Sequence, residues 1–316
     1  MNDRRDPHPA AAPGGPIRRD SPVDPATFVL RMVCYYDVFR HPLTEAELGR
    51  LVGFDPGAAV DRLVAEGRVE RAFGHVCAVG RASQVERRVA RTVAAERRWP
   101  AARRAGRLLA MFPWVRAVLI TGGLSKQSAD ADGDVDFLLL IEPGSVWTAK
   151  SALQAFRRAL PEGIRENFCT NYLLATDRLA LDERNMFTAM ELATAVPVHG
   201  AAWCVALLDA NREWAADHVP GFEWSRERAS HAPTHPPFAP TRLIEGVTRP
   251  VAHTLDRASF SVWDGYWNRK YSWLPEGTRS QRFKRRPEVA TNHLHDFQAY
   301  VLAEYVRRCV ASGVTP

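Results

Sequence analysis

The sequence predicts an α+β protein with three parts: N-terminal helices followed by a hairpin, a small central mixed sheet with flanking helices, and a helical C-terminal region. Two short apolar runs, 118–120 and 137–141, are bounded by turn residues and resemble buried strands. Around them, apolar residues recur at helical spacing between capping residues, prolines and glycines. The chain has 316 residues, 46% of them hydrophobic, which is enough for two or three domains.

The N-terminal region divides into a tail and a compact unit. Residues 1–23 are rich in Pro, Arg, Asp and Ala and carry few large apolar groups, so we expect a disordered tail. Asp24 precedes a proline and should cap a first helix. Thr44 and Glu47 have the spacing of a capping box for a second helix. A third helix and a hairpin over 69–79 complete a domain that we place at 24–82.

The order of helix, helix-turn-helix and hairpin resembles a winged helix. A winged helix that reads DNA should offer basic and amide side chains from its third helix. The charged residues there are balanced in sign: Asp55, Asp61, Arg62, Glu66 and Arg68. We therefore favour a packing role for this domain, with DNA binding as the alternative.

Residues 83–113 should form connecting helices. Ser83 and Glu86 have the spacing of a second capping box, and Pro100 is expected to divide the region into two helices. The segment is rich in arginine. Such a run is usually a solvated helix face, and the alternative is a path for a polyphosphate or nucleic acid.

The central domain, placed at 114–220, contains the candidate chemistry. A glycine pair, Gly122 and Gly123, follows the first strand, and its backbone N–H groups can approach a phosphate closely. Asp134 and Asp136 precede the second strand at i and i+2, so their side chains should share one face. Two carboxylates that close repel each other, and Mg²⁺ prefers such oxygen ligands together with substrate phosphates.

The pattern of strand, Gly-Gly and serine, Asp-x-Asp and strand resembles the nucleotidyltransferase fold of the DNA polymerase β superfamily. The phrase at 36–44 is similar to the start of the winged-helix segment in a bacterial subfamily. The resemblance implies that a glycine-serine turn holds a nucleoside triphosphate and that the Asp-x-Asp pair binds Mg²⁺ or Mn²⁺. The matching positions in this chain are Gly122, Gly123 and Ser125 for the turn and Asp134 and Asp136 for the metal. Lys126 could contact a phosphate as a point charge.

Active members of that family usually carry a third carboxylate on the strand after the next helix. Here a helix is expected over 146–160, and the strand that follows has no acid in its interior. Asn171 is the polar residue best placed to face the acidic pair, and its amide oxygen could bind a hard cation. Asn171 could equally be an ordinary hydrogen-bonded strand residue. The missing charge leaves a weaker second metal, another ligand or a pseudoenzyme as alternatives.

The C-terminal region, 221–316, should be helical after an irregular segment over 221–240. Aromatic and basic residues alternate over 263–286, which could stack bases and hold phosphates. We favour core positions for the tryptophans and surface positions for the arginines. The segment is the best candidate acceptor site outside the central domain.

Composition limits the class of protein. The net charge is +6 and the pI is about 9.3, which suits a polyanionic ligand without requiring one. Five scattered cysteines without CxxC spacing indicate reduced thiols. No apolar run reaches 18 residues, so we expect a soluble, cytoplasmic chain without membrane partners.

We therefore expect a nucleotidyltransferase that moves a nucleoside monophosphate from a triphosphate such as ATP to an unidentified hydroxyl acceptor. The alternatives are a DNA-binding regulator and a catalytically silent nucleotide-binding or interaction protein. A nucleic-acid partner is not favoured.

Overall fold

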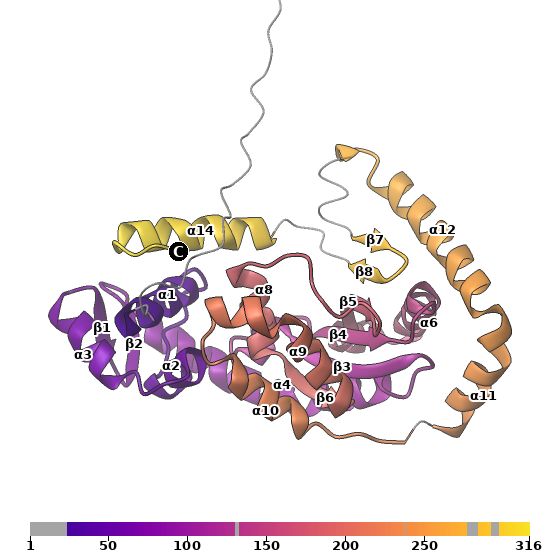
Figure 1. Cartoon of the computed structure of the whole chain (residues 1–316), viewed down its shortest axis with the longest axis horizontal. Coiled ribbons are helices and arrows are strands. Elements are labelled where there is room, and N and C mark those ends of the chain that lie inside the picture. The colour runs from indigo at the N-terminus through magenta and orange to yellow at the C-terminus, as the bar shows by residue number, and fades with distance from the viewer. Residues whose placement is uncertain (1–23, 130–132, 237, 277–283, 292–296) are drawn as a thin grey trace, which may run out of the picture.

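The computed structural model describes residues 24–129, 133–236, 238–276, 284–291 and 297–316. The α+β class is confirmed, because helices surround a small open sheet with both parallel and antiparallel strands (Figure 1). The predicted N-terminal tail lies outside the described residues.

The described elements keep the labels of Figure 1. The α-helices are α1 (Pro25–Asp37), α2 (Glu45–Val52), α3 (Gly57–Ala65), α4 (Gln84–Leu109), α5 (Gly122–Ser125), α6 (Val146–Ala159), α7 (Glu162–Arg165), α8 (Met186–Thr194), α9 (Ala201–His218), α10 (Phe222–Ser230), α11 (Ala239–Thr248), α12 (Ala252–Lys270) and α14 (Phe297–Ala311). The strands are β1 (Val69–Ala72), β2 (His75–Ala78), β3 (Val115–Thr121), β4 (Asp136–Ile141), β5 (Cys169–Ala175), β6 (Val196–His199), β7 (Arg285–Arg286) and β8 (Val289–Thr291). Two short 3₁₀ helices are η1 (Glu166–Phe168) and η2 (Arg249–Val251).

The N-terminal unit has the predicted order of three helices and a hairpin. The Asp24 carboxylate accepts a hydrogen bond from the Ala26 amide at the start of α1. The capping box of α2 is complete, because Thr44 accepts from the Glu47 amide and Glu47 accepts from the Thr44 amide. The local start signals at α1 and α2 are therefore confirmed.

The connecting segment is one helix, and the predicted division at Pro100 is wrong. Helix α4 continues through Pro100. A proline removes the bond to the carbonyl four residues earlier, and both Pro100 and Glu96 are exposed, so solvent can satisfy that carbonyl. The predicted capping box is also absent, because the Ser83 backbone is already helical and its side chain makes no capping bond.

The central sheet has the strand order β6-β3-β4-β5-β8-β7. Strands β4 and β5 are parallel and are joined through α6, whereas the other neighbours are antiparallel. A crossover helix runs back along the sheet, so the end of α6 lies near the edge at which β4 and β5 begin.

Helices cover both faces of the sheet. Leu119 and Leu138 lie on the face that packs in one core with residues of α1, α8, α9 and α14. Ile120, Phe137 and Leu139 lie on the opposite face, in a second core with residues of α4, α6 and α12. Figure 1 shows α11 and α12 curving around the outside of the molecule beyond α6, and α14 lying beside α1. Residues distant in sequence thus complete both layers.

The C-terminal region is not wholly helical, contrary to expectation. Strands β7 and β8 extend the central sheet, and β8 pairs with β5. Helix α10 occupies much of the segment at 221–240 that we predicted to be irregular. Strands β7 and β8 are only two and three residues long, so an alternation of apolar and polar residues could not reveal them.

Candidate functional site

The two predicted acidic residues lie where three strands meet at one edge of the sheet. Asp136 begins β4 and pairs with Thr121 at the end of β3 and with Cys169 at the start of β5. Asp134 is exposed and precedes the strand, rather than lying within it. Val135 between them is completely buried, which places the two aspartates away from the core position it fills.

Gly122 closely approaches one member of the acidic pair, Asp136. Gly122 has φ +70°, and a Cβ atom there would lie 2.2 Å from Oδ2 of Asp136. A Cβ atom on Gly123 would lie 2.9 Å from the carbonyl oxygen of Ser128. Glycine is therefore required at Gly122 both by backbone conformation and by close approach to the carboxylate. The segment Gly122–Ser125 forms a single helical turn, which we call the glycine corner.

The glycine corner already binds an anion from the chain itself. The Gly122 amide donates to Oε2 of Glu191 at 3.1 Å, and the Lys126 ammonium donates to Oε1 of Glu191 at 2.7 Å. Lys126 also donates to the Gly122 carbonyl, as does the Ser125 hydroxyl. The residues predicted to hold a triphosphate are thus brought together, with the carboxylate of α8 on their donors.

The surroundings of Asp136 disfavour the charged form of its carboxyl group. Burial, followed by the negative charges of Glu191 and Asp134, raises the pKa of the Asp136 carboxyl to about 7, against a smaller opposing effect of Lys126. A carboxyl group with this pKa is partly protonated near neutral pH. The site therefore holds more negative charge than Lys126 compensates.

Asn171 lies beside the acidic pair, as predicted, but presents its N–H group. Its Nδ2 donates to Oδ1 of Asp136 at 2.5 Å, and its Oδ1 accepts from the Cys169 thiol at 3.0 Å. The register of β4 and β5 shifts at this point, so Asn171 faces no partner residue across the ladder. Such an irregularity redirects a side chain, here toward Asp136.

The donor set fits a hard divalent cation. Asp134, Asp136 and the Asn171 amide offer oxygen atoms, and a half-turn of the amide would exchange its nitrogen for its oxygen. The raised pKa of Asp136 is what a cation would relieve. Within the described ranges, no three His, Cys, Asp or Glu residues form a metal-binding group. Asn171 would supply a neutral third ligand.

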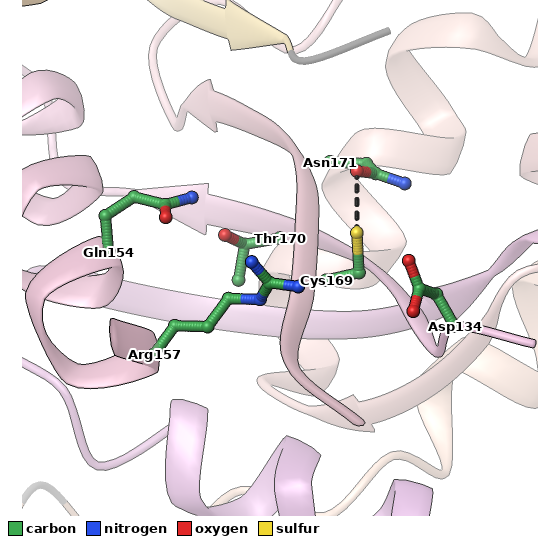
Figure 2. Close-up of a pocket in the computed structure, with 6 residues that line it drawn as sticks. All are labelled: Asp134, Gln154, Arg157, Cys169, Thr170 and Asn171. Carbon is green, nitrogen blue, oxygen red and sulfur yellow. Dashed lines mark hydrogen bonds between the residues drawn. The ribbon is translucent and has the colours of Figure 1, made fainter. Parts of the chain in front are cut away.

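A pocket of about 300 Å³ opens beside Asp134. Figure 2 shows its lining residues: Asp134, Gln154, Arg157, Cys169, Thr170 and Asn171. Two of them, Gln154 and Arg157, come from α6. Sequence reasoning missed these two, although a crossover between parallel strands predicts that its last turns lie at this edge. The contact of Glu191 with the glycine corner could not be predicted from the sequence either, because α8 carries no motif.

The aromatic and basic segment near the C-terminus is mostly engaged in internal contacts. Trp267 is buried as predicted, whereas Trp273 is 72% exposed and contradicts the expected core position. Lys284 pairs with Glu183, and Arg285 pairs with Asp264. Residues 277–283, which carry two of its arginines, lie outside the described residues. Lys284 and Arg285 are thus engaged in ion pairs, whereas Arg269 and Lys270 are exposed.

Comparison of the chain with family models, curated proteins and solved structures gives no match. No helix in the described part of the chain is long and apolar enough to cross a membrane.

Proposed function

We propose that this protein is a Mg²⁺- or Mn²⁺-dependent nucleotidyltransferase that transfers a nucleoside monophosphate to a hydroxyl-bearing acceptor. The observation that supports this proposal best is the close approach of Gly122 to the Asp136 carboxylate, while the Gly122 amide donates to the Glu191 carboxylate. A cation site and an anion site thus share one glycine, as binding of a metal-nucleotide complex requires.

In this proposal, acidic side chains hold the cation, and Gly122 and Lys126 bind a phosphate. Asp134 and Asp136 would hold the cation, with Asn171 as a neutral third ligand. The cation would neutralise phosphate oxygens and lower the pKa of a bound hydroxyl. Gly122 and Lys126 would donate to a phosphate in the position that Glu191 occupies. Gly123 and Ser125 shape the turn, and the Ser125 hydroxyl bonds the Gly122 carbonyl.

The proposed reaction is the one that the family resemblance implies. The acceptor oxygen forms a bond to the α-phosphorus, the bond to the bridging oxygen breaks, and pyrophosphate leaves. The hydroxyl proton is released. Catalysis of this kind depends on positioning and charge stabilisation, which the fixed corner and the acidic pair provide.

A second candidate is a catalytically silent nucleotide-binding protein. The position of the third family carboxylate is taken by Asn171, whose N–H group bonds Asp136. Loss of one ligand charge weakens metal binding and can leave nucleotide recognition intact.

DNA binding by the N-terminal unit, which we propose to be a winged helix, receives less support. Arg62 pairs with Asp24 and Glu66, and Arg71 pairs with Glu45 and Asp61. These basic groups are therefore already paired.

Thermal unfolding with each of ATP, CTP, GTP and UTP, with and without Mg²⁺, tests the proposal. We expect stabilisation that needs both nucleotide and metal, because a ligand raises apparent stability only when it binds the folded state. Asp134→Asn and Asp136→Asn should abolish the effect, whereas Asp177→Asn, at an exposed position after β5, should not. Transfer of labelled nucleotide to an acceptor separates the enzyme from the silent binder. Stabilisation by no nucleotide in the presence of Mg²⁺ would exclude both.

A further inference from the structure

The pocket beside Asp134 lies on the side of the acidic pair away from the glycine corner. Oδ2 of Asp136 faces Gly122, whereas Oδ1 accepts from Asn171, which lines the pocket. A triphosphate held at the glycine corner would therefore leave the pocket open. The substrate that meets it across Asp134 and Asp136 is the acceptor.

The guanidinium of Arg157 is a positively charged group in this pocket that is oriented by the chain and can bind an anion. Arg157 extends from α6 toward Thr170 and Cys169 in Figure 2. Its Nε donates to the Arg165 carbonyl at 3.2 Å, and Arg165 is itself held by the Leu160 carbonyl at 2.7 Å. These bonds orient the guanidinium. Its terminal nitrogens make no hydrogen bond or ion pair within the described residues, so they can bind an anion in a two-point contact.

The remaining lining groups are small or polar. The Gln154 amide and the Thr170 hydroxyl make no hydrogen bond with other described residues and can contact hydroxyl groups of a ligand. A volume of about 300 Å³ is at the small end of the range for small-molecule sites. The pocket thus suits a compact polar molecule rather than a folded partner.

We propose that this pocket binds the acceptor, and that the acceptor is a small polyhydroxy compound whose phosphate or carboxylate group contacts Arg157. This inference rests on the proposed nucleotidyltransferase function. Arg157 anchors the anionic end, Gln154 and Thr170 contact the body, and a free hydroxyl points toward Asp134 and Asp136. In the transfer, that O–H bond breaks, a new oxygen–phosphorus bond forms at the α-phosphorus, and pyrophosphate and a proton leave.

Three six-carbon sugar compounds separate the two anion types from a neutral ligand: glucose 6-phosphate, gluconate and glucose. Calorimetric titration of the full chain with each, at fixed salt, should show binding of at least one of the two anions and much weaker binding of glucose. Arg157→Gln should weaken anion binding by about tenfold or more, because it removes charged hydrogen bonds. Arg157→Lys should recover part of the loss, since lysine keeps the charge without the planar fork.

Arg158→Gln is the matched control, because Arg158 is the next residue of α6 and is exposed. It should bind the anion like the wild type. Equal binding of all three compounds, equal losses in Arg157→Gln and Arg158→Gln, or no anion binding would overturn the inference.

Nucleotide binding separates this inference from the function on which it rests. Arg157→Gln should retain the stabilisation by Mg²⁺ and nucleotide that Asp136→Asn loses. Metal-dependent nucleotide binding with transfer to neutral sugars would sustain the function and refute the anionic acceptor. Arg157-dependent anion binding without nucleotide binding would sustain the anion pocket and refute its role as an acceptor site.

Discussion

Asp136 shows how a single carboxyl group links stability to the proposed cation. Its pKa is raised to about 7 in the folded chain, mainly by burial, against an ordinary value of 3.8. The folded state therefore binds the proton more tightly than the unfolded state does. Stability contributed by this group is fully present below pH 3.8 and is lost as pH rises to about 7.

Asp136→Asn should consequently stabilise the metal-free protein above pH 7, by at most about 4 kcal/mol, and have a smaller effect at pH 5. Urea unfolding at several pH values in a chelator measures the difference. Asp177→Asn supplies the control, because that acid is exposed. A difference in the free energy of unfolding between Asp136→Asn and wild type that stayed constant from pH 5 to 8 would contradict the raised pKa of Asp136. Mg²⁺ should stabilise the wild type more at pH 8 than at pH 6, because protons compete for Asp136.

Lys150 makes stability depend on pH in the opposite direction from Asp136. Its ammonium lies 5.0 Å and 5.6 Å from the ring centroids of Trp267 and Trp263 and makes no hydrogen bond with any residue that the structure describes. The residue as a whole is 1% exposed. Burial lowers its pKa from 10.5 to about 8. The folded state thus binds this proton more weakly than the unfolded state, and stability rises as pH increases from about 8 to 10.5.

Lys150→Met should raise the free energy of unfolding at pH 7 by up to about 3 kcal/mol, because methionine fills similar space without a charge. The advantage should shrink as pH approaches 10. Denaturant titrations at pH 7 and pH 10 measure it, with exposed Lys270→Met for comparison. A destabilised variant at pH 7 would show instead that the cation–π contacts outweigh the cost of burial.

At the scale of elements, the sequence predicted those whose signals are local. Thr44 and Glu47 specify the start of α2, and the apolar run of β4 specifies a buried strand. The predicted division at Pro100 was wrong because the rest of α4 offsets the cost of a proline within a helix. This helix packs Ala95, Ala102 and Leu109 into a core.

The residues of the candidate site also fall into those with a local sequence signal and those without one. The glycine corner and the acidic pair could be predicted because they are adjacent to their strands in sequence. Glu191 could not be assigned its role, because α8 reaches the corner only through tertiary packing. Arg157 was missed for a related reason, since a lone arginine at a helix end carries no signal until the crossover places it beside β5.

The packing of α8 against the glycine corner predicts competition for its anion site. Glu191→Gln removes the charge that occupies the donors of Gly122 and Lys126. Inorganic triphosphate should therefore bind about tenfold more tightly to the variant, because a charged group no longer has to be displaced. Calorimetry with triphosphate measures the change. Glu227→Gln is an exposed control on α10. Weaker binding in Glu191→Gln would indicate that Glu191 supports the site rather than competes for it.

At the scale of the whole molecule, Arg88 connects three regions. Its side chain is 4% exposed on α4, and Nη2 donates to Oε1 of Glu47 at 2.6 Å. Nε donates to the Pro42 carbonyl and Nη1 to the Gln127 carbonyl, each at 3.3 Å. One buried guanidinium therefore joins the N-terminal unit, the long helix and the loop that follows the glycine corner.

Arg88→Met should lower the free energy of unfolding by about 3 kcal/mol, because a buried ion pair loses one partner and leaves Glu47 partly uncompensated. Arg87→Met should have little effect, since Arg87 is the exposed neighbour. Adding Glu47→Gln should restore part of the loss, because glutamine keeps the capping position without the charge. Because Arg88 also holds the Gln127 carbonyl, the single variant should bind Mg²⁺ and nucleotide more weakly in thermal unfolding. If Arg88→Met were as stable as Arg87→Met and bound nucleotide equally, the N-terminal unit would be energetically independent of the site.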